Sequence, residues 1–126
     1  MIDDSRAMFR VIVAGSRSFD DYGMLCETMD TLLKEEKKTH DISIVCGKAR
    51  GADTLGERYA IERGYGVLEF PAKWNEYGKS AGHIRNEEMA RNADALVAFW
   101  DGQSAGTRDM ITLAKRNGLS TRVRKF

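Results

Sequence analysis

The stretch "IVCGKARGADTLGERYA" (residues 44–60) decides the fold that this sequence predicts. An apolar, β-type run ends at Cys46, the glycines Gly47 and Gly51 bracket two basic residues, and a helix-type segment follows. In an open parallel sheet, ligands bind beyond the carboxyl ends of the strands, where the next helix offers unpaired N–H groups. Glycine at such an exit lets a phosphate approach the backbone closely. The stretch therefore predicts a parallel α/β fold with an anion site at this strand exit.

The same pattern occurs twice more, in "VIVAGSRSF" (residues 11–19) and "VAFWDGQSAGTRDM" (residues 97–110). Any one of these loops is equally explained by the geometry of a turn between a strand and a helix, which uses glycine for its own sake. Three such exits on parallel strands would, however, face one crevice. Together they predict an anion-binding or nucleotide-binding crevice.

Near-continuous apolar runs predict strands that are covered on both faces, as in parallel sheets. These runs are residues 10–14, 42–46, 67–70 and 95–99, with a weaker fifth run at 121–124. Helix-length segments lie between them, at residues 23–38, 52–63, 80–92 and 107–117. The longest irregular stretch is residues 71–79. The alternation predicts one doubly wound α/β domain over residues 1–126, with a sheet of about five strands.

The composition excludes several classes of protein. The chain carries 20 basic and 19 acidic side chains, so a net charge of +1 gives no global attraction to nucleic acid or to a membrane. Two cysteines are typical of reduced thiols in a cytosolic protein. No apolar run approaches the length of a membrane span, and the first ten residues do not resemble a signal peptide, so we expect a cytoplasmic location.

The G-x-G-x-x-G, P-loop and zinc-site motifs are absent, so we predict no metal and no cofactor besides a nucleotide ligand.

Four motifs in chain order resemble the SLOG superfamily of Rossmann-like domains, which includes the LOG proteins and the DNA-processing protein DprA. The motifs are "GSR" (residues 15–17), Gly47 with "RGAD" (residues 50–53), "YGKSAGHIRNEEM" (residues 77–89) and "DGQSAGT" (residues 101–107). The resemblance covers roughly residues 9–123 and is closest to the small YspA-like branch, a domain of unknown function. It implies a three-layer Rossmann-like fold with strand order 3-2-1-4-5, and a homo-oligomer.

LOG proteins cleave the N-glycosidic bond of N6-modified adenosine monophosphates, and two of their signatures are altered in this chain. The H-x-R-K-x-x-M helix occurs as "HIRNEEM" (residues 83–89), which places the family's arginine at Arg85 and puts Asn86 in place of lysine. In the P-G-G-x-G-T-x-x-E turn and helix, the glycine–threonine pair matches, but Met110 stands at the position of the catalytic glutamate. A thioether cannot act as a base. The resemblance therefore implies nucleotide binding with weak or no LOG-type hydrolysis.

Charged, hydroxyl and glycine residues at the strand exits are the candidate site residues, because arginine suits bidentate phosphate contacts and glycine leaves the backbone accessible. The predicted ligand-binding or phosphate-binding residues are Gly15, Ser16, Arg17, Gly47, Lys48, Arg50, Gly51, Ala52, Asp53, Arg85, Asn86, Gly102, Ser104, Gly106, Thr107 and Arg108. The predicted catalytic residues are Arg85, Asp53 and Glu87, with Asp109 as a further candidate carboxylate. The residues predicted to stack on a base are Trp74 and Tyr77.

Structural roles remain open for several of these residues. Asp53 at a helix start is equally well explained as an N-cap or a partner of the helix dipole, and Thr107 as a helix cap. His83 lies on a polar helix and is typical of a surface histidine. Trp74 and Tyr77 are equally suited to packing the loop at residues 71–79 or to a subunit contact.

Three functions follow as alternatives. The first is a protein that senses or sequesters a nucleotide-derived ligand, such as a nucleoside monophosphate or ADP-ribose. The second is a nucleotide N-glycosidase that resembles LOG, or a phosphohydrolase, with another carboxylate replacing the missing glutamate. The third is a DNA-binding adaptor that resembles DprA, which the balanced charge and the lack of a basic stripe disfavour.

Overall fold

The backbone follows the predicted alternation of strands and helices, in a computed structural model that describes residues 6–48 and 50–126. The strands are β1 (Ala7–Gly15), β2 (His40–Cys46), β3 (Gly66–Glu69), β4 (Ala95–Trp100) and β5 (Ser120–Lys125). The helical segments are α1 (Tyr22–Leu33), α2 (Glu36–Thr39), α3 (Ala52–Arg63), α4 (Trp74–Tyr77), the 3-10 turn η1 (Gly78–Ser80), α5 (Ala81–Arg91) and α6 (Ala105–Arg116).

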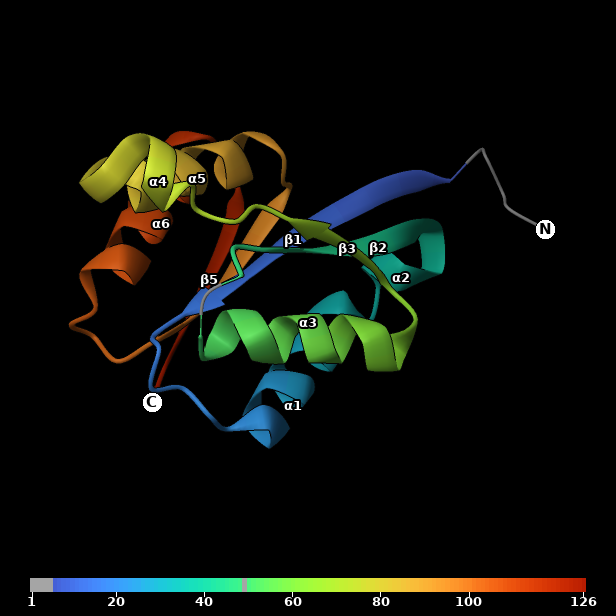
Figure 1. The fold of residues 1–126 in the computed structure, drawn as a ribbon. Coiled ribbons are helices and arrows are strands. Elements are labelled where there is room, and N and C mark those ends of the chain that lie inside the picture. Colours follow the sequence, from blue (N-terminus) through green and yellow to red (C-terminus); the bar gives the residue numbers. More distant parts are fainter. Residues whose placement is uncertain (1–5, 49) are drawn as a thin grey trace.

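All neighbouring strands are parallel, and their order is β3-β2-β1-β4-β5. Strand β1 lies at the centre of the sheet, where Val11 is in register with Ile44 of β2 and with Ala95 of β4. The strand arrows run toward the end of the sheet at which the chain terminates (Figure 1). This topology confirms the predicted fold class and strand order, and it places the ends of β1, β2 and β4 at one edge.

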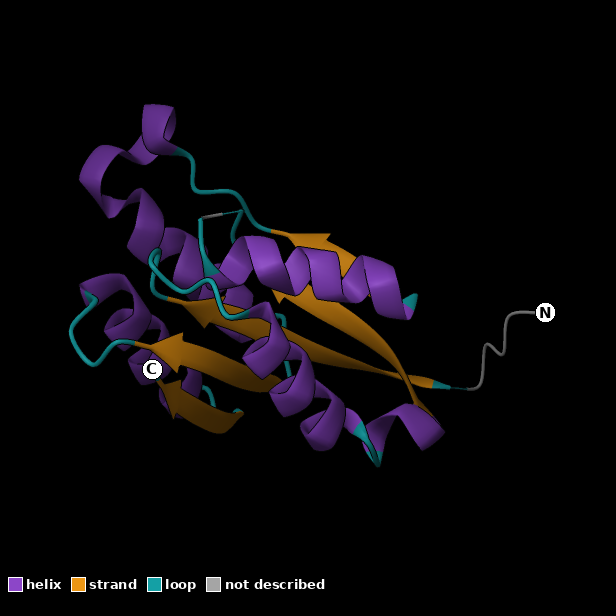
Figure 2. Cartoon of the chain, turned by 90° about the horizontal axis from the view of Figure 1, so that it is seen from below, coloured by secondary structure: helices purple, strands orange, loops and turns teal. Residues whose placement is uncertain are grey.

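Alternation along β1 divides the core between the two faces of the sheet. Val11 and Val13 pack with residues of α1 and α3, such as Leu25 and Tyr59, whereas Ile12 packs with residues of α5 and α6. Helices α1 and α3 accordingly lie below the sheet in Figure 1, and α5 and α6 lie above it. Figure 2 shows the lower pair of helices in front of the strands. The result is the expected three-layer arrangement of helices, sheet and helices.

Two predicted segments differ in the structure, the helix at residues 23–38 and the irregular stretch at residues 71–79. The single helix predicted at residues 23–38 is instead α1 followed by the short α2, since Leu33 is the last buried residue and the next six residues are polar. The irregular stretch predicted at residues 71–79 contains α4 and η1. Helix α3 has the predicted bounds and ends at Gly64, whose φ of 71° suits a left-handed C-terminal cap.

Strand β3 corrects the prediction that residues 67–70 form a strand covered on both faces. It is an edge strand, paired only with β2, and Leu68 remains 37% exposed. The two-sided cover that makes parallel strands apolar reaches only the inner strands of the sheet. None of the helices within residues 6–48 and 50–126 is long and apolar enough to cross a membrane.

Candidate functional site

A cavity of about 520 Å³ opens at the carboxyl ends of β1 and β4, between the first turns of α5 and α6. We call it the first cavity. Its lining comes from the exit of β1, from Asp53 at the start of α3, from Trp74 of α4, and from α5 and α6. A volume of this size is within the range of about 300–1,000 Å³ that is typical of small-molecule sites. A cavity of suitable size therefore lies at the edge of the sheet where the crevice was predicted.

The β4–α6 turn is tied to the exit of β1 by a hydrogen-bond network around Asp101. Oδ1 of Asp101 accepts hydrogen bonds from the backbone N–H groups of Gln103 and Ser104, each at 2.8 Å. The hydroxyl oxygens of Ser104 and Ser16 lie 2.9 Å apart, and the Ser16 hydroxyl accepts from the backbone N–H of Asp101 at 3.1 Å. Ser16 is 2% exposed, and its hydroxyl holds the two loops together where they border the first cavity.

The same network holds the pKa of Asp101 below its ordinary value of 3.8, at about 2, mainly because the N–H groups of Ser104 and Gln103 donate to the carboxylate. A carboxylate with a lowered folded-state pKa stabilises the fold above its unfolded pKa and loses that contribution as pH falls through the folded value. We therefore expect the thermal stability advantage of wild type over Asp101→Asn to be complete above about pH 4 and to vanish as pH falls to about 2. Thermal unfolding of both proteins across this range measures it, and an advantage that does not depend on pH would contradict the assignment.

Among the described residues, no side chain caps the N–H groups in the first turn of α6. Ser104 is the N-cap residue, but its hydroxyl bonds to Ser16 and Asp101 and makes no cap hydrogen bond to the helix. Thr107, which the sequence suggested as a cap, lies inside the helix and is 5% exposed. Both Gly106 and Thr107 line the first cavity. Free N–H donors and the positive end of the helix dipole make such a terminus suited to an anion.

Helices α5 and α6 meet through three polar side chains that line the first cavity. Nδ1 of His83 lies 2.9 Å from Oδ1 of Asp109. Nδ2 of Asn86 donates to Oδ2 of Asp109 at 3.0 Å and to the carbonyl of Gly106 at 3.3 Å. Asn86, which replaces the lysine of the LOG motif, therefore positions Asp109, which in turn orients the imidazole of His83.

Arg85 lies where the exit of β2 approaches α5. Its Nη1 donates to the carbonyl of Gly47 at 2.6 Å, and its Nε donates to Oδ1 of Asn86 at 2.9 Å. A Cβ at position 47 would stand 2.5 Å from Nη1 of Arg85 and 3.0 Å from Oδ2 of Asp53. A larger residue at position 47 would therefore displace the Arg85 guanidinium from this place over the backbone.

The structure brings most of the predicted residues to the crevice, divided between two neighbouring cavities. The predicted residues that line the first cavity are Gly15, Ser16, Arg17, Asp53, Trp74, Arg85, Asn86, Ser104, Gly106 and Thr107. A second cavity of about 510 Å³ shares Arg17, Trp74 and Arg85 with the first, and Gly47, Lys48 and Arg50 complete its predicted lining. Ala49, between Lys48 and Arg50, is outside the described residues.

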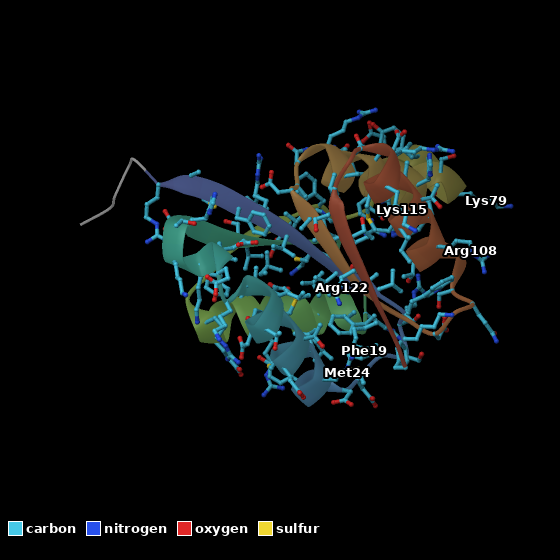
Figure 3. The ribbon with its side chains drawn as sticks, turned by 180° about the vertical axis from the view of Figure 1, so that it is seen from behind. Phe19, Met24, Lys79, Arg108, Lys115 and Arg122 are labelled. Carbon is cyan, nitrogen blue, oxygen red and sulfur yellow. The ribbon has the colours of Figure 1, made fainter. Side chains whose placement is uncertain are left out.

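Several predicted residues lie outside both cavities. Glu87 pairs with Arg91 at 3.7 Å, and Arg108 lies over the ring of Trp100. Tyr77 borders a small recess on α5. Figure 3 shows the Arg108 side chain at the periphery of the molecule. Neither cavity is lined by Gly51, Ala52 or Gly102, which lie where the chain passes from β2 to α3 and from β4 to α6.

Sequence reasoning missed the packing residues of the site. Ala14, Ser18, Gly82 and Met89 also line the first cavity. Met89 belongs to the matched helix motif, and its helical spacing to Arg85 and Asn86 was the signal that could have placed it on the cavity side. Asp101 carried no such signal beyond its place in the β4–α6 turn.

Comparison with known proteins identifies a family and solved structures of the same fold. The model of the family described as "YspA, cpYpsA-related SLOG family" matches residues 9–77. The Gene 61 protein of Mycobacterium phage D29 is 35% identical over 118 residues, which cover 89% of this chain and 93% of that protein.

Solved structures show the same fold at low sequence identity. The DNA processing protein A (DprA) of Streptococcus pneumoniae superposes with a TM-score of 0.69 and 17% identity, over 93% of this chain, and this chain spans half the length of that structure. The DprA structure from Helicobacter pylori was described for its single-stranded DNA binding mode. It superposes with a TM-score of 0.65 and 19% identity, over 91% of this chain and 64% of that one. The structure of TM1055 superposes with a TM-score of 0.64 and 21% identity, over 90% of this chain and 72% of that one.

Proposed function

The chain belongs to the YspA, cpYpsA-related SLOG family, and on that premise we propose that it binds a nucleotide or nucleotide-derived ligand in the first cavity, as a sensor or sequestering protein. One observation carries the proposal. The uncapped first turn of α6 and the guanidinium groups of Arg17 and Arg85 border a single cavity at the carboxyl ends of parallel strands. These are the donors that phosphate oxygens require.

Arg17 has capacity to spare for such a ligand. Within the described part of the chain, its side chain makes no hydrogen bond or ion pair, and it lines the cavity from the exit of β1. Arg85 still offers three of its five donors, because within the described residues only Nε and one hydrogen of Nη1 are engaged. Both arginines can therefore bind an anion without breaking a bond within the protein.

We expect Arg17→Ala and Arg85→Ala each to weaken binding of a nucleoside monophosphate by about 1.5–3 kcal/mol, the contribution of a hydrogen bond to a charged group. Isothermal titration calorimetry with a panel of nucleoside 5′-monophosphates measures the change. Arg108→Ala is the matched control, because its guanidinium lies over Trp100, outside both cavities. Equal affinities for wild type and both cavity variants would refute the assignment of the crevice.

Hydrolysis of the bound nucleotide is the second candidate function. It is favoured by the arrangement of His83 on Asp109, because an imidazole held by a carboxylate can act as a general acid or base beside a ligand in the same cavity. Incubation with nucleoside monophosphates, followed by chromatographic separation of base, nucleoside and phosphate, distinguishes an enzyme from a binding protein. Turnover that disappears in Asp109→Asn would establish the enzyme, whereas unchanged nucleotide would favour the sensor.

Single-stranded DNA is a third candidate ligand, since the similar Helicobacter pylori structure was described for that binding mode. The net charge of +1 in this chain disfavours it. Fluorescence anisotropy with a labelled single strand, at two salt concentrations, tests this alternative, because phosphate contacts make affinity strongly dependent on salt.

The homo-oligomer and the cytoplasmic location stay predictions, and light scattering on the purified protein tests the first.

A further inference from the structure

The second cavity differs from the first in its charge. Its described lining residues include no carboxylate. They include four cationic side chains, those of Arg17, Lys48, Arg50 and Arg85. The first cavity, in contrast, contains the carboxylates of Asp53 and Asp109. In a protein whose total charge is +1, four cations around one hollow form a local anion site.

Two of these cations, Lys48 and Arg50, follow β2, and the backbone of Lys48 has an unusual conformation. Lys48 has a φ of 60°, a region that residues other than glycine rarely adopt and that is concentrated at ligand sites. Its Nζ lies 3.1 Å from Oε2 of Glu57 and 3.3 Å from Oε1 of Glu69. These carboxylates fix the ammonium group at the rim. They also offset part of its charge, so Arg50 is the principal unengaged cation contributed by this loop.

Arg50 is exposed, and within the described residues its guanidinium has no hydrogen-bond or ion-pair partner. It lines the same cavity as Arg85, whose position is set by its bonds to the carbonyl of Gly47 and to Asn86. One cation of the pair is therefore fixed before any ligand arrives. A fixed donor loses less conformational entropy when a ligand binds.

The two cavities lie side by side, because the side chains of Arg17, Trp74 and Arg85 line both. Each cavity has by itself the volume of an ordinary small-molecule site. A nucleoside monophosphate that fills the first cavity would leave the cations of the second without an anion. A ligand with a further phosphate can reach across the shared arginines.

From this arrangement we propose that the second cavity is a subsite for an additional phosphate, and that the ligand class is a nucleotide carrying at least two phosphates. The inference rests on the proposed function, since the nucleoside portion is assigned to the first cavity. Arg17 and Arg85 contact the phosphate at the junction, and Arg50 binds the distal phosphate.

Calorimetric titration with matched 5′-monophosphates and 5′-diphosphates of adenosine, guanosine, cytidine and uridine, without divalent cations, tests the subsite. We expect the diphosphate of the preferred base to bind about tenfold tighter than its monophosphate, the gain of one charge-assisted contact. Arg50→Ala should remove most of that gain and change monophosphate affinity by less than about twofold. Lys79→Ala is the matched control, because Lys79 is exposed and lines neither cavity.

The outcomes separate the two levels of the account. Equal affinity for mono- and diphosphates in wild type, or an equal loss of both in Arg50→Ala, would overturn the subsite and leave the proposed function standing. Absence of binding by every nucleotide would overturn both. Thermal unfolding of Arg50→Ala checks that the variant is folded, which we expect because the side chain is exposed.

Discussion

Gly15→Ala is expected to lower the free energy of unfolding by about 3 kcal/mol, the upper end of the usual cost of overpacking. A Cβ at this position would collide with the backbone carbonyl oxygen of Phe99 in β4 and would stand 2.8 Å from the Cβ of Ala52. Neither neighbour is the flexible end of a long side chain, so relief requires moving β4 or the start of α3. Because Gly15 joins β1 to the crevice, nucleotide affinity should fall together with stability. Urea unfolding monitored by circular dichroism measures the change.

Gly106→Ala is the matched control for this prediction. A Cβ at position 106 meets no atom within 4 Å, and the residue lies in the first turn of α6. Replacing a helical glycine by alanine at an open position typically adds about 0.4–1 kcal/mol of stability. Equal effects of the two substitutions would show that the close contact of β1 with β4 does not limit residue 15.

Met110→Glu is expected to destabilise the protein by about 3–5 kcal/mol, the cost of a buried charge without a partner. Met110 occupies the position of the LOG glutamate, and it does line the first cavity. Its side chain is nevertheless 1% exposed and packs against Ile12, Met89 and Leu96 beneath the site. A glutamate there would become an ion in an apolar layer, so we expect no recovery of LOG-type base release. Chemical denaturation and an assay for free base test the two parts.

Met110→Leu should cost less than about 1.5 kcal/mol, because it conserves volume and adds no charge. The deficit of Met110→Glu should also shrink as pH falls from neutral toward about 4, since a buried carboxyl group has a raised pKa and is tolerated in its protonated form. A stable Met110→Glu protein that cleaves a nucleoside monophosphate would show that the site accommodates a carboxylate at residue 110.

The fold was predictable because apolar runs alternate with helix-length segments and three of the runs are followed by glycine. The start of α3 follows from the stretch at residues 44–60 and its end from Gly64, and the order of the sheet follows from the family resemblance. The splitting of α1 from α2 and the exposure of β3 were not predicted, because a local pattern does not show which strand lies at the edge. Leu68 is apolar, as residues of buried strands are, and still remains 37% exposed.

The site was predictable at the level of loops and less so at the level of side chains. Arg17 and Arg85 lie at the crevice as predicted, whereas Arg108 and Glu87 point elsewhere, because one residue along a helix turns a side chain by about 100°. The partnership of Asn86 with Asp109 joins two helices that are distant in sequence. Such a contact depends on how α5 and α6 pack, and no single motif contains that information.

The most direct test of the central claim is a titration of ¹⁵N-labelled protein with nucleoside 5′-mono- and diphosphates, followed through the backbone amide resonances. The account predicts saturable shifts at Gly15, Gly106 and Thr107, where the exit of β1 meets the first turn of α6. It predicts little change at Gly64 and Gly118, which follow the carboxyl-terminal ends of α3 and α6. Shifts confined to Gly64 and Gly118, or no shift at saturating nucleotide, would contradict binding at the crevice.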